Sequence, residues 1–103
     1  MSTIEIRAII FKEGDVWVGQ CLEYDIGAQA ADLDTLDARL RAVTFAECEA
    51  GFDATGKPFG GIPKAPDFFW RLWDETGSRL TPARGNLFEK AGSRVNVEMA
   101  IAA

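Results

Sequence analysis

Ile4 to Glu23 reads IEIRAIIFKEGDVWVGQCLE, and this stretch decides the fold. Apolar and charged side chains alternate at its start, and this period of two predicts a strand over residues 4–12 with one buried face. Glu13-Gly14-Asp15 then interrupts the pattern with residues typical of a turn. A second alternating run follows over residues 16–23. Two such runs joined by a short turn predict a β-hairpin.

The first run becomes apolar on both faces toward its end. Ile10 continues the alternating apolar set, while Ile9 and Phe11 place apolar side chains on the opposite face. A strand that is apolar on both faces is typical of a position between two layers. We therefore expect another segment of the chain to cover the opposite face at this end.

Downstream of the hairpin, the sequence predicts a short third strand and an amphipathic helix. Residues 28–32 are poor in β-branched residues, which favours a short or edge strand. Asp34 and Thr35 are both suitable N-caps for the helix, and Gly51 is a suitable C-terminal stop. The stripe expected to face the sheet consists of Leu33, Leu36, Leu40, Val43 and Ala50.

Three helix side chains depart from this pattern. Glu47 projects into the apolar stripe, either as a carboxylate that reaches water at the edge of the sheet or as a partly buried functional acid. Phe45 and Phe52 lie near the opposite face, where either later segments of the chain or another subunit would cover them. Together with the Trp-rich segment over residues 67–76, Phe45 and Phe52 form an apolar surplus that predicts a homo-oligomer, and a homodimer is its simplest closed form.

The rest of the chain predicts one more helix and one more strand. Residues 53–66 are interrupted by Gly and Pro and predict a loop, and residues 67–76 (DFFWRLWDET) predict a short aromatic-rich helix. Residues 78–93 are expected to be irregular, with a short turn of structure near 86–90. Residues 94–102 alternate again and predict a last, half-buried strand.

These elements predict a single α+β domain over residues 1–103. Its sheet is expected to be mainly antiparallel, in the order β-β-β-α-β, with one main helix on one face. The long loop and the short helix fall within residues 53–93, before the last strand. A chain of 103 residues with 48% apolar residues can build one such core.

Composition narrows the classes of function. The chain has no histidine, which excludes Ser-His and Cys-His nucleophile systems. Its net charge of −5 disfavours binding to nucleic acid, because phosphates would be repelled. We expect no cofactor, no metal and no membrane span, a cytoplasmic location, and reduced, buried thiols at Cys21 and Cys48.

A longer pattern extends from Val16 to Val43, which reads VWVGQCLEYDIGAQAADLDTLDARLRAV. Together with the preceding turn, it combines an aromatic on the second strand, a corner, a bend and a Thr-initiated amphipathic helix. In order and spacing this resembles the HicB-type antitoxins of bacterial toxin–antitoxin systems. The residues that carry the resemblance are Gly14, Trp17, Cys21-Leu22-Glu23, Gln29 and Thr35-Leu36, with Gly61 to Pro66 and Val95 to Ile101 matching the later proline-containing stretch and the last strand.

The resemblance implies a partial ribonuclease-H-like fold without ribonuclease activity. It also implies homo-oligomers that bind a small basic toxin and cover its RNA-cleaving surface. Ala30 stands where the family has a glycine, and Ala38-Arg39 where it often has Glu-Ala. The chain ends at Ala103, so we expect no C-terminal DNA-binding segment of the kind that many relatives carry. An orphan domain that keeps this core without a toxin partner is the alternative.

Candidate protein-binding residues fall in the corner and in the aromatic segment. Aromatic side chains supply anchoring energy at protein interfaces, and acidic ones suit a basic partner. The alternative for the aromatic segment is a lid that folds back over Ile9, Phe11 and Trp17. The candidates are Glu23, Tyr24 and Asp25 at the corner, and Phe68, Phe69, Trp70 and Trp73 in the aromatic segment.

A metal-dependent nuclease is the rival interpretation. Phosphoryl transfer with metal ions needs three or four carboxylates that converge on one site. The first strand has no acid in its middle, and Glu5, Glu47 and Glu98 would have to meet. A third interpretation is a small-molecule pocket between the sheet and the aromatic helix, although no residue indicates its ligand. We expect a protein-binding module and not an enzyme.

Overall fold

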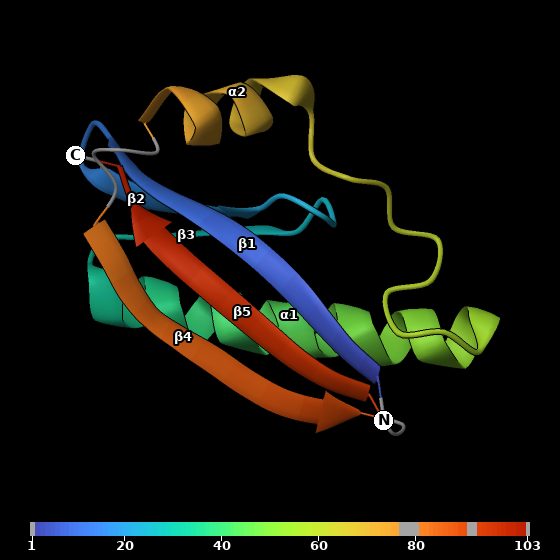
Figure 1. Ribbon diagram of the computed structural model, residues 1–103. Helices are drawn as coiled ribbons and strands as arrows, with labels where there is room; N and C mark the ends of the chain where they lie inside the picture. The colour runs from blue at the N-terminus through green and yellow to red at the C-terminus, as the bar shows by residue number, and fades with distance from the viewer. Residues whose placement is uncertain (1, 77–80, 91–92, 103) are drawn as a thin grey trace.

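A computed structural model describes residues 2–76, 81–90 and 93–102, with side chains described over 3–75 and 94–102. It is an α+β structure in which one sheet lies between a long helix and a short one (Figure 1). This confirms the predicted fold class. The elements are β1 (Ser2–Glu13), β2 (Val16–Cys21), β3 (Gly27–Ala30), α1 (Leu33–Thr55), α2 (Asp67–Thr76), β4 (Thr81–Lys90) and β5 (Ser93–Ile101).

The sheet has the strand order β3-β2-β1-β5-β4. Strand β1 lies in the middle, antiparallel to β2 and parallel to β5. The other pairs, β2 with β3 and β4 with β5, are antiparallel. Helix α1 covers one face, which we call the core face, and α2 lies against part of the other, which we call the second face (Figure 1).

The predicted hairpin is confirmed, with a turn of two residues. Glu13 pairs with Val16, which leaves Gly14 and Asp15 to reverse the chain. Gly14 has φ +62°, a left-handed value that the first turn position of a type II′ hairpin needs and that glycine adopts at low cost.

The hydrophobic core lies between the sheet and α1. Ile6, Ala8 and Ile10 of β1 are buried on the core face, in register with Val97, Met99 and Ile101 of β5. The helix approaches β2 closely at Gly19, where an added Cβ would lie 3.2 Å from Leu40 Cδ2. The buried helix residues that complete this layer are Leu36, Leu40, Thr44, Cys48 and Gly51.

Helix α1 begins earlier than predicted. Its N-cap is Asp32 and not Asp34 or Thr35, because the Asp32 carboxylate accepts hydrogen bonds from the Thr35 N–H at 2.8 Å and the Thr35 hydroxyl at 2.9 Å. These bonds lower the pKa of Asp32. Arg39, one turn further along, donates to the backbone carbonyl of Gln29 in β3 at 2.9 Å.

The helix also ends later than predicted. It continues past Gly51 to Thr55, and Gly56 closes it with φ +79° while donating its N–H to the Phe52 carbonyl. Gly51 is buried inside the helix, because the segment around Phe59 and Gly60 packs directly on it.

One residue of the predicted stripe and the three side chains that departed from it take different positions. Ala50 is exposed, so its place in the buried stripe was wrong, and Glu47 is half-buried. Phe52 is half-buried, whereas Phe45 stays 40% exposed on the outer side of α1. The described part of the chain therefore covers Phe45 only in part.

Strand β4 is the main difference from the sequence-based expectation. Residues 78–93 were expected to be irregular, but residues 81–90 pair antiparallel with β5. The register shifts between Ala83 and Asn86, which is a bulge around Gly85. In the described sheet β4 pairs with β5 alone, and an edge strand of this kind tolerates Pro82.

A methyl group added at Gly51 should destabilise the protein. Its Cβ would lie 2.4 Å from the Gly60 nitrogen and 2.7 Å from the Phe59 carbonyl carbon, and backbone atoms at this distance have to move. We expect Gly51→Ala to lower the free energy of unfolding by about 2 kcal/mol, although alanine is the better helix former. Gly56→Ala is the control, because an added Cβ there has open space and costs only the left-handed conformation, about 1 kcal/mol. Urea denaturation measures both, and a more stable Gly51→Ala would contradict the packing.

Both thiols should be inert in the folded protein. Cys21 and Cys48 are buried, and burial raises the pKa of Cys21 to about 11. At about pH 8 we expect a thiol reagent to modify neither cysteine in the native state and both in guanidinium, because the thiolate is the reactive form. Mass spectrometry of the labelled chain checks this, and rapid native labelling would show that the core opens.

Candidate protein-binding site

The connection between the two helices positions α2. After α1, residues 56–66 return to the corner that follows β2, where Ala65 N–H donates to the Leu22 carbonyl at 2.9 Å. Asp25 N–H donates to the Pro63 carbonyl at 2.7 Å. These two bonds attach the proline-containing stretch to the corner. Helix α2 begins directly afterwards, over the second face.

Helix α2 packs on the second face through its aromatic side chains. Phe69 contacts Phe11 of β1, with ring centroids 6.3 Å apart. The Arg7 guanidinium lies over the rings of Trp70 and Trp73, at 4.8 and 5.7 Å from their centroids. The aromatic segment therefore folds back on the sheet, as the lid alternative predicted for Phe11.

The lid does not extend over Trp17. Trp17 packs against the hydrophobic core on the α1 side, because it lies on the opposite face of β2 from Val18. Its ring carries the Lys12 ammonium at 5.5 Å. The lid alternative was therefore wrong for Trp17.

Arg7 and Glu23 form the polar link between the sheet and the corner. The Glu23 carboxylate accepts the Arg7 backbone N–H on one oxygen and the Arg7 Nε–H on the other, each at 2.7 Å. The guanidinium thus lies between a carboxylate and two indole rings, and both interactions stabilise a cation. Sequence reasoning missed Arg7, which had the pattern of an ordinary exposed strand residue.

The indole N–H of Trp70 is an unusual hydrogen-bond donor. This group is buried and has no hydrogen-bond acceptor in the described part of the chain. Lys64 reaches the same ring, with its ammonium 5.9 Å from the centroid. The ring is thus fixed by two cations and by packing rather than by its own N–H.

The three corner candidates point in different directions. Glu23 binds Arg7, as above. Tyr24 stacks on Phe59, with centroids 4.5 Å apart and planes 16° from parallel, and packs against the core. Asp25 is exposed and accepts a hydrogen bond from Gln20 Nε2 at 2.9 Å. The three side chains therefore mainly make contacts within the fold, and they do not form one continuous binding surface.

The aromatic candidates divide between the two sides of α2. Phe69, Trp70 and Trp73 are half-buried against the sheet. Phe68 is 56% exposed and meets Phe69 edge-on at 5.2 Å. Of the four, Phe68 presents the largest surface to a partner.

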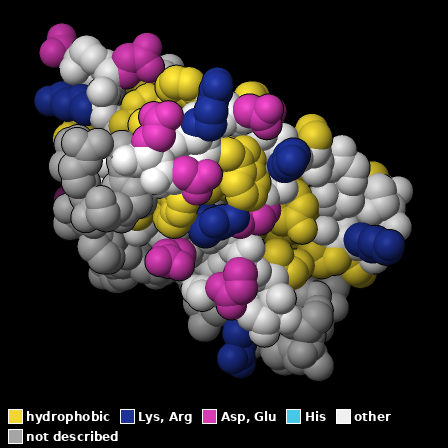
Figure 2. Space-filling view, turned by 45° about the horizontal axis from the view of Figure 1, so that its top comes forward, with side chains coloured by type: hydrophobic (Ala, Val, Ile, Leu, Met, Phe, Trp, Pro, Cys, Tyr) yellow, Lys and Arg dark blue, Asp and Glu magenta, His cyan; other side chains and the backbone are white. Residues whose placement is uncertain are grey.

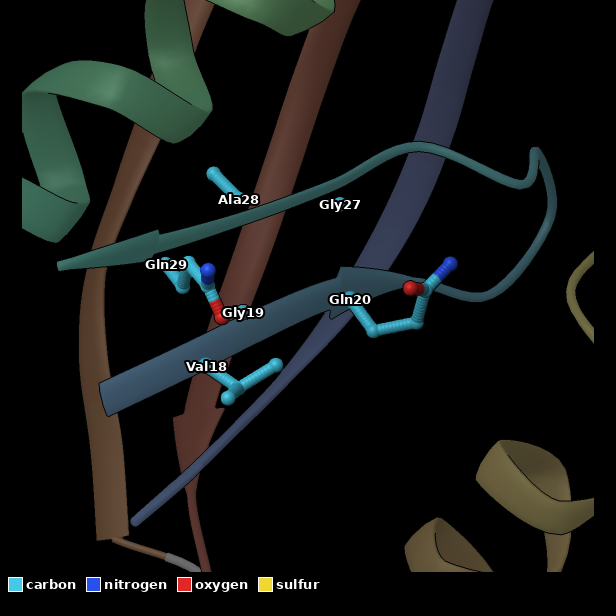
Figure 3. Close-up of a pocket in the computed structure, with 6 residues that line it drawn as sticks. All are labelled: Val18, Gly19, Gln20, Gly27, Ala28 and Gln29. Carbon is cyan, nitrogen blue, oxygen red and sulfur yellow. The ribbon is translucent and has the colours of Figure 1, made fainter. Parts of the chain in front are cut away.

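Shallow hollows lie at several places on the surface. One of about 270 Å³ lies over β2 and β3 and is lined by Val18, Gly19, Gln20, Gly27, Ala28 and Gln29 (Figure 3). Figure 3 shows Ala28 on the side of α1, with Val18 and Gln20 leaving β2 on the other side. None of the described residues that line this hollow is titratable. Another of about 200 Å³ lies on α2, between Phe68, Arg71, Leu72 and Glu75.

The carboxylates of the rival nuclease interpretation do not meet. Glu5 lies on the second face, where its carboxylate accepts from Asn96 Nδ2 at 3.0 Å, and Glu98 lies beside Arg7 in the register. Glu47 belongs to α1, across the sheet. Among the described residues, no group of three or more His, Cys, Asp or Glu side chains is close enough to hold a metal ion.

Charges of both signs surround the apolar surface near α2. Figure 2 shows acidic and basic side chains interleaved over hydrophobic patches on this side of the molecule. On α2 itself, Asp67, Asp74 and Glu75 outnumber Arg71. The helix is therefore an acidic element with an aromatic side chain exposed.

Comparisons of the chain with models of known protein families, with curated proteins and with solved structures found no match. None of the helices in the described residues is both long and apolar enough to span a membrane.

Removal of the Glu23 charge should loosen α2. We expect Glu23→Gln to lower the free energy of unfolding by about 1–2 kcal/mol, because Arg7 loses a charged acceptor in a partly buried position. Tryptophan emission should shift to the red as Trp70 and Trp73 become more hydrated. Arg41→Gln is the control, since it removes an exposed ion pair with Asp37 that contributes about 0.5 kcal/mol or less. Equal effects of the two variants in urea denaturation would contradict the role given to Glu23.

Proposed function

We propose that this chain is a non-enzymatic, cytoplasmic protein-binding module of the HicB antitoxin type, which neutralises a small basic RNA-cleaving toxin. In this proposal the sheet is a partial ribonuclease-H-like sheet used as a scaffold. The toxin's RNA-cleaving surface is covered by the bound module, and no cofactor takes part.

The order of the elements is the observation that carries the proposal. Three strands, one long helix and a last strand follow one another, as the resemblance implies, with α2 and β4 inserted before the last strand. The last strand returns to the middle of the sheet beside β1. The residues that carry the resemblance also occupy the positions expected of a shared scaffold: Gly14 in the turn, Cys21 and Leu22 buried, Glu23 at the corner, and Leu36 buried on α1.

Charge and surface support binding over catalysis. The net charge of −5 suits a basic partner. The nuclease rival needs Glu5, Glu47 and Glu98 together, and the sheet lies between Glu47 and the other two. Exposed Phe45 favours self-association as well, and we include a homodimer in the proposal.

The proposal is tested by capture and reconstitution. The tagged full chain is expressed at its natural level in its source cell, and its complexes are purified and identified by intact-mass spectrometry. We expect a small basic protein in stoichiometric amount. That protein, purified alone, should cleave RNA, and an equimolar amount of this chain should abolish the cleavage.

Other outcomes have defined meanings. Recovery of the chain only with itself, as a discrete oligomer, would contradict the toxin partner and leave the orphan-domain alternative. RNA cleavage by the chain alone with Mg²⁺, lost in Glu47→Gln, would replace the proposal with the nuclease. A partner whose RNA cleavage continues in the complex would refute neutralisation.

A further inference from the structure

The outer side of α2 has two parallel ridges. Phe68 and Leu72 are four residues apart and form one ridge, and Arg71 and Glu75 are also four apart and form the other. The hollow of about 200 Å³ lies between these four side chains. In helix packing, a ridge of one helix inserts into such a groove between the i, i+4 rows of another.

The exposed side of this groove is apolar along one ridge. Phe68 is 56% exposed, and Leu72 beside it is half-buried. The opposite side of the helix is already occupied, because Phe69, Trp70 and Trp73 contact β1 through Phe11 and Arg7. Packing against β1 therefore holds α2 in place, while the apolar ridge of the groove is exposed to solvent.

The acidic excess of α2 favours a basic partner. Helix α2 carries Asp67, Asp74 and Glu75 against a single Arg71, and the whole chain has a net charge of −5. A second copy of α2 would place two acidic helices together, and this like-charge contact is unfavourable. A basic segment meets the same groove with complementary charge.

We propose that the groove between Phe68, Arg71, Leu72 and Glu75 is the docking site for an amphipathic helix of a basic partner protein. The partner helix inserts an apolar ridge beside Phe68 and Leu72. Its lysine or arginine side chains pair with Glu75, which lines the groove, and with Asp74 on the flank of the groove. This inference rests on the proposed function for the partner's basic character, and it assigns the contact to α2 rather than to the corner residues Glu23, Tyr24 and Asp25.

A designed peptide tests the groove directly. The probe is a fluorescent helical peptide of about 18 residues, long enough to form helix on contact, with leucines along one i, i+4 ridge and lysines elsewhere. Anisotropy titration of the full chain should show saturable binding at low salt. The same peptide with glutamates in place of lysines should not bind.

Matched variants locate the contact. Phe68→Ser keeps every charge and should weaken the lysine peptide about tenfold or more, because it removes the apolar anchor. Ala46→Ser changes an exposed side chain on α1, across the sheet from α2, and should leave the affinity unchanged. The double variant Asp74→Asn with Glu75→Gln keeps the apolar ridge and should also weaken binding and reduce its dependence on salt.

The outcomes separate this inference from the proposed function. The proposed docking site would be refuted if wild type and Phe68→Ser bound the lysine peptide with equal affinity. It would also be refuted if the wild type did not bind the peptide. If a toxin is captured and Phe68→Ser neutralises it with unchanged affinity, the function stands and the groove is refuted. A Phe68→Ser chain that loses only its self-association in light scattering would identify a second copy as the occupant and overturn the basic partner. Unchanged tryptophan emission shows that α2 remains docked in each variant.

Discussion

The structure depends on the burial of β1 on both faces. Its even-numbered side chains from Ile6 to Ile10 pack under α1, and Ile9 is fully buried on the second face. The same strand carries Arg7 on the second face, so an aromatic helix can pack there only if the guanidinium is neutralised and its plane is covered. The Glu23 carboxylate neutralises the guanidinium, and the indoles of Trp70 and Trp73 cover its plane. The corner after β2 therefore determines where α2 lies, although the two are far apart in sequence.

Local patterns predicted most of the elements, and pairing between distant segments decided the rest. Alternation and Gly14 were sufficient for the hairpin, and the apolar period of α1 was sufficient for the helix. Strand β4 could not be predicted, because residues 81–90 (TPARGNLFEK) contain Pro, Gly and three charges without alternation, and β5 supplies the hydrogen bonds that local propensity does not. The N-cap was displaced because Asp32, Asp34 and Thr35 are all suitable, and the end of β3 decides among them.

The sequence predicted the aromatic residues of the candidate site but not the directions in which their side chains point. The cluster of aromatics over 68–73 indicated a helix with apolar contacts, but a short helix of this kind has aromatics on most of its sides. Which of them faces water depends on the position of Arg7, a residue whose strand pattern gives no sign of that role. The residues that carry the family resemblance are mainly turn, corner and core positions. They specify a scaffold, and the proposed partner-binding surface on α2 can vary independently of them.

The contact of Arg39 with β3 has a consequence for growth of the sheet. Short β3 ends one side of the sheet, where a strand from another molecule could otherwise add by backbone hydrogen bonding. The Gln29 carbonyl in this edge already accepts a hydrogen bond from the Arg39 guanidinium. An incoming strand that used this carbonyl would have to break that bond and would meet a fixed positive charge. Helix α1 thus makes the addition of a strand at this edge less favourable, because one carbonyl of the short β3 is already occupied.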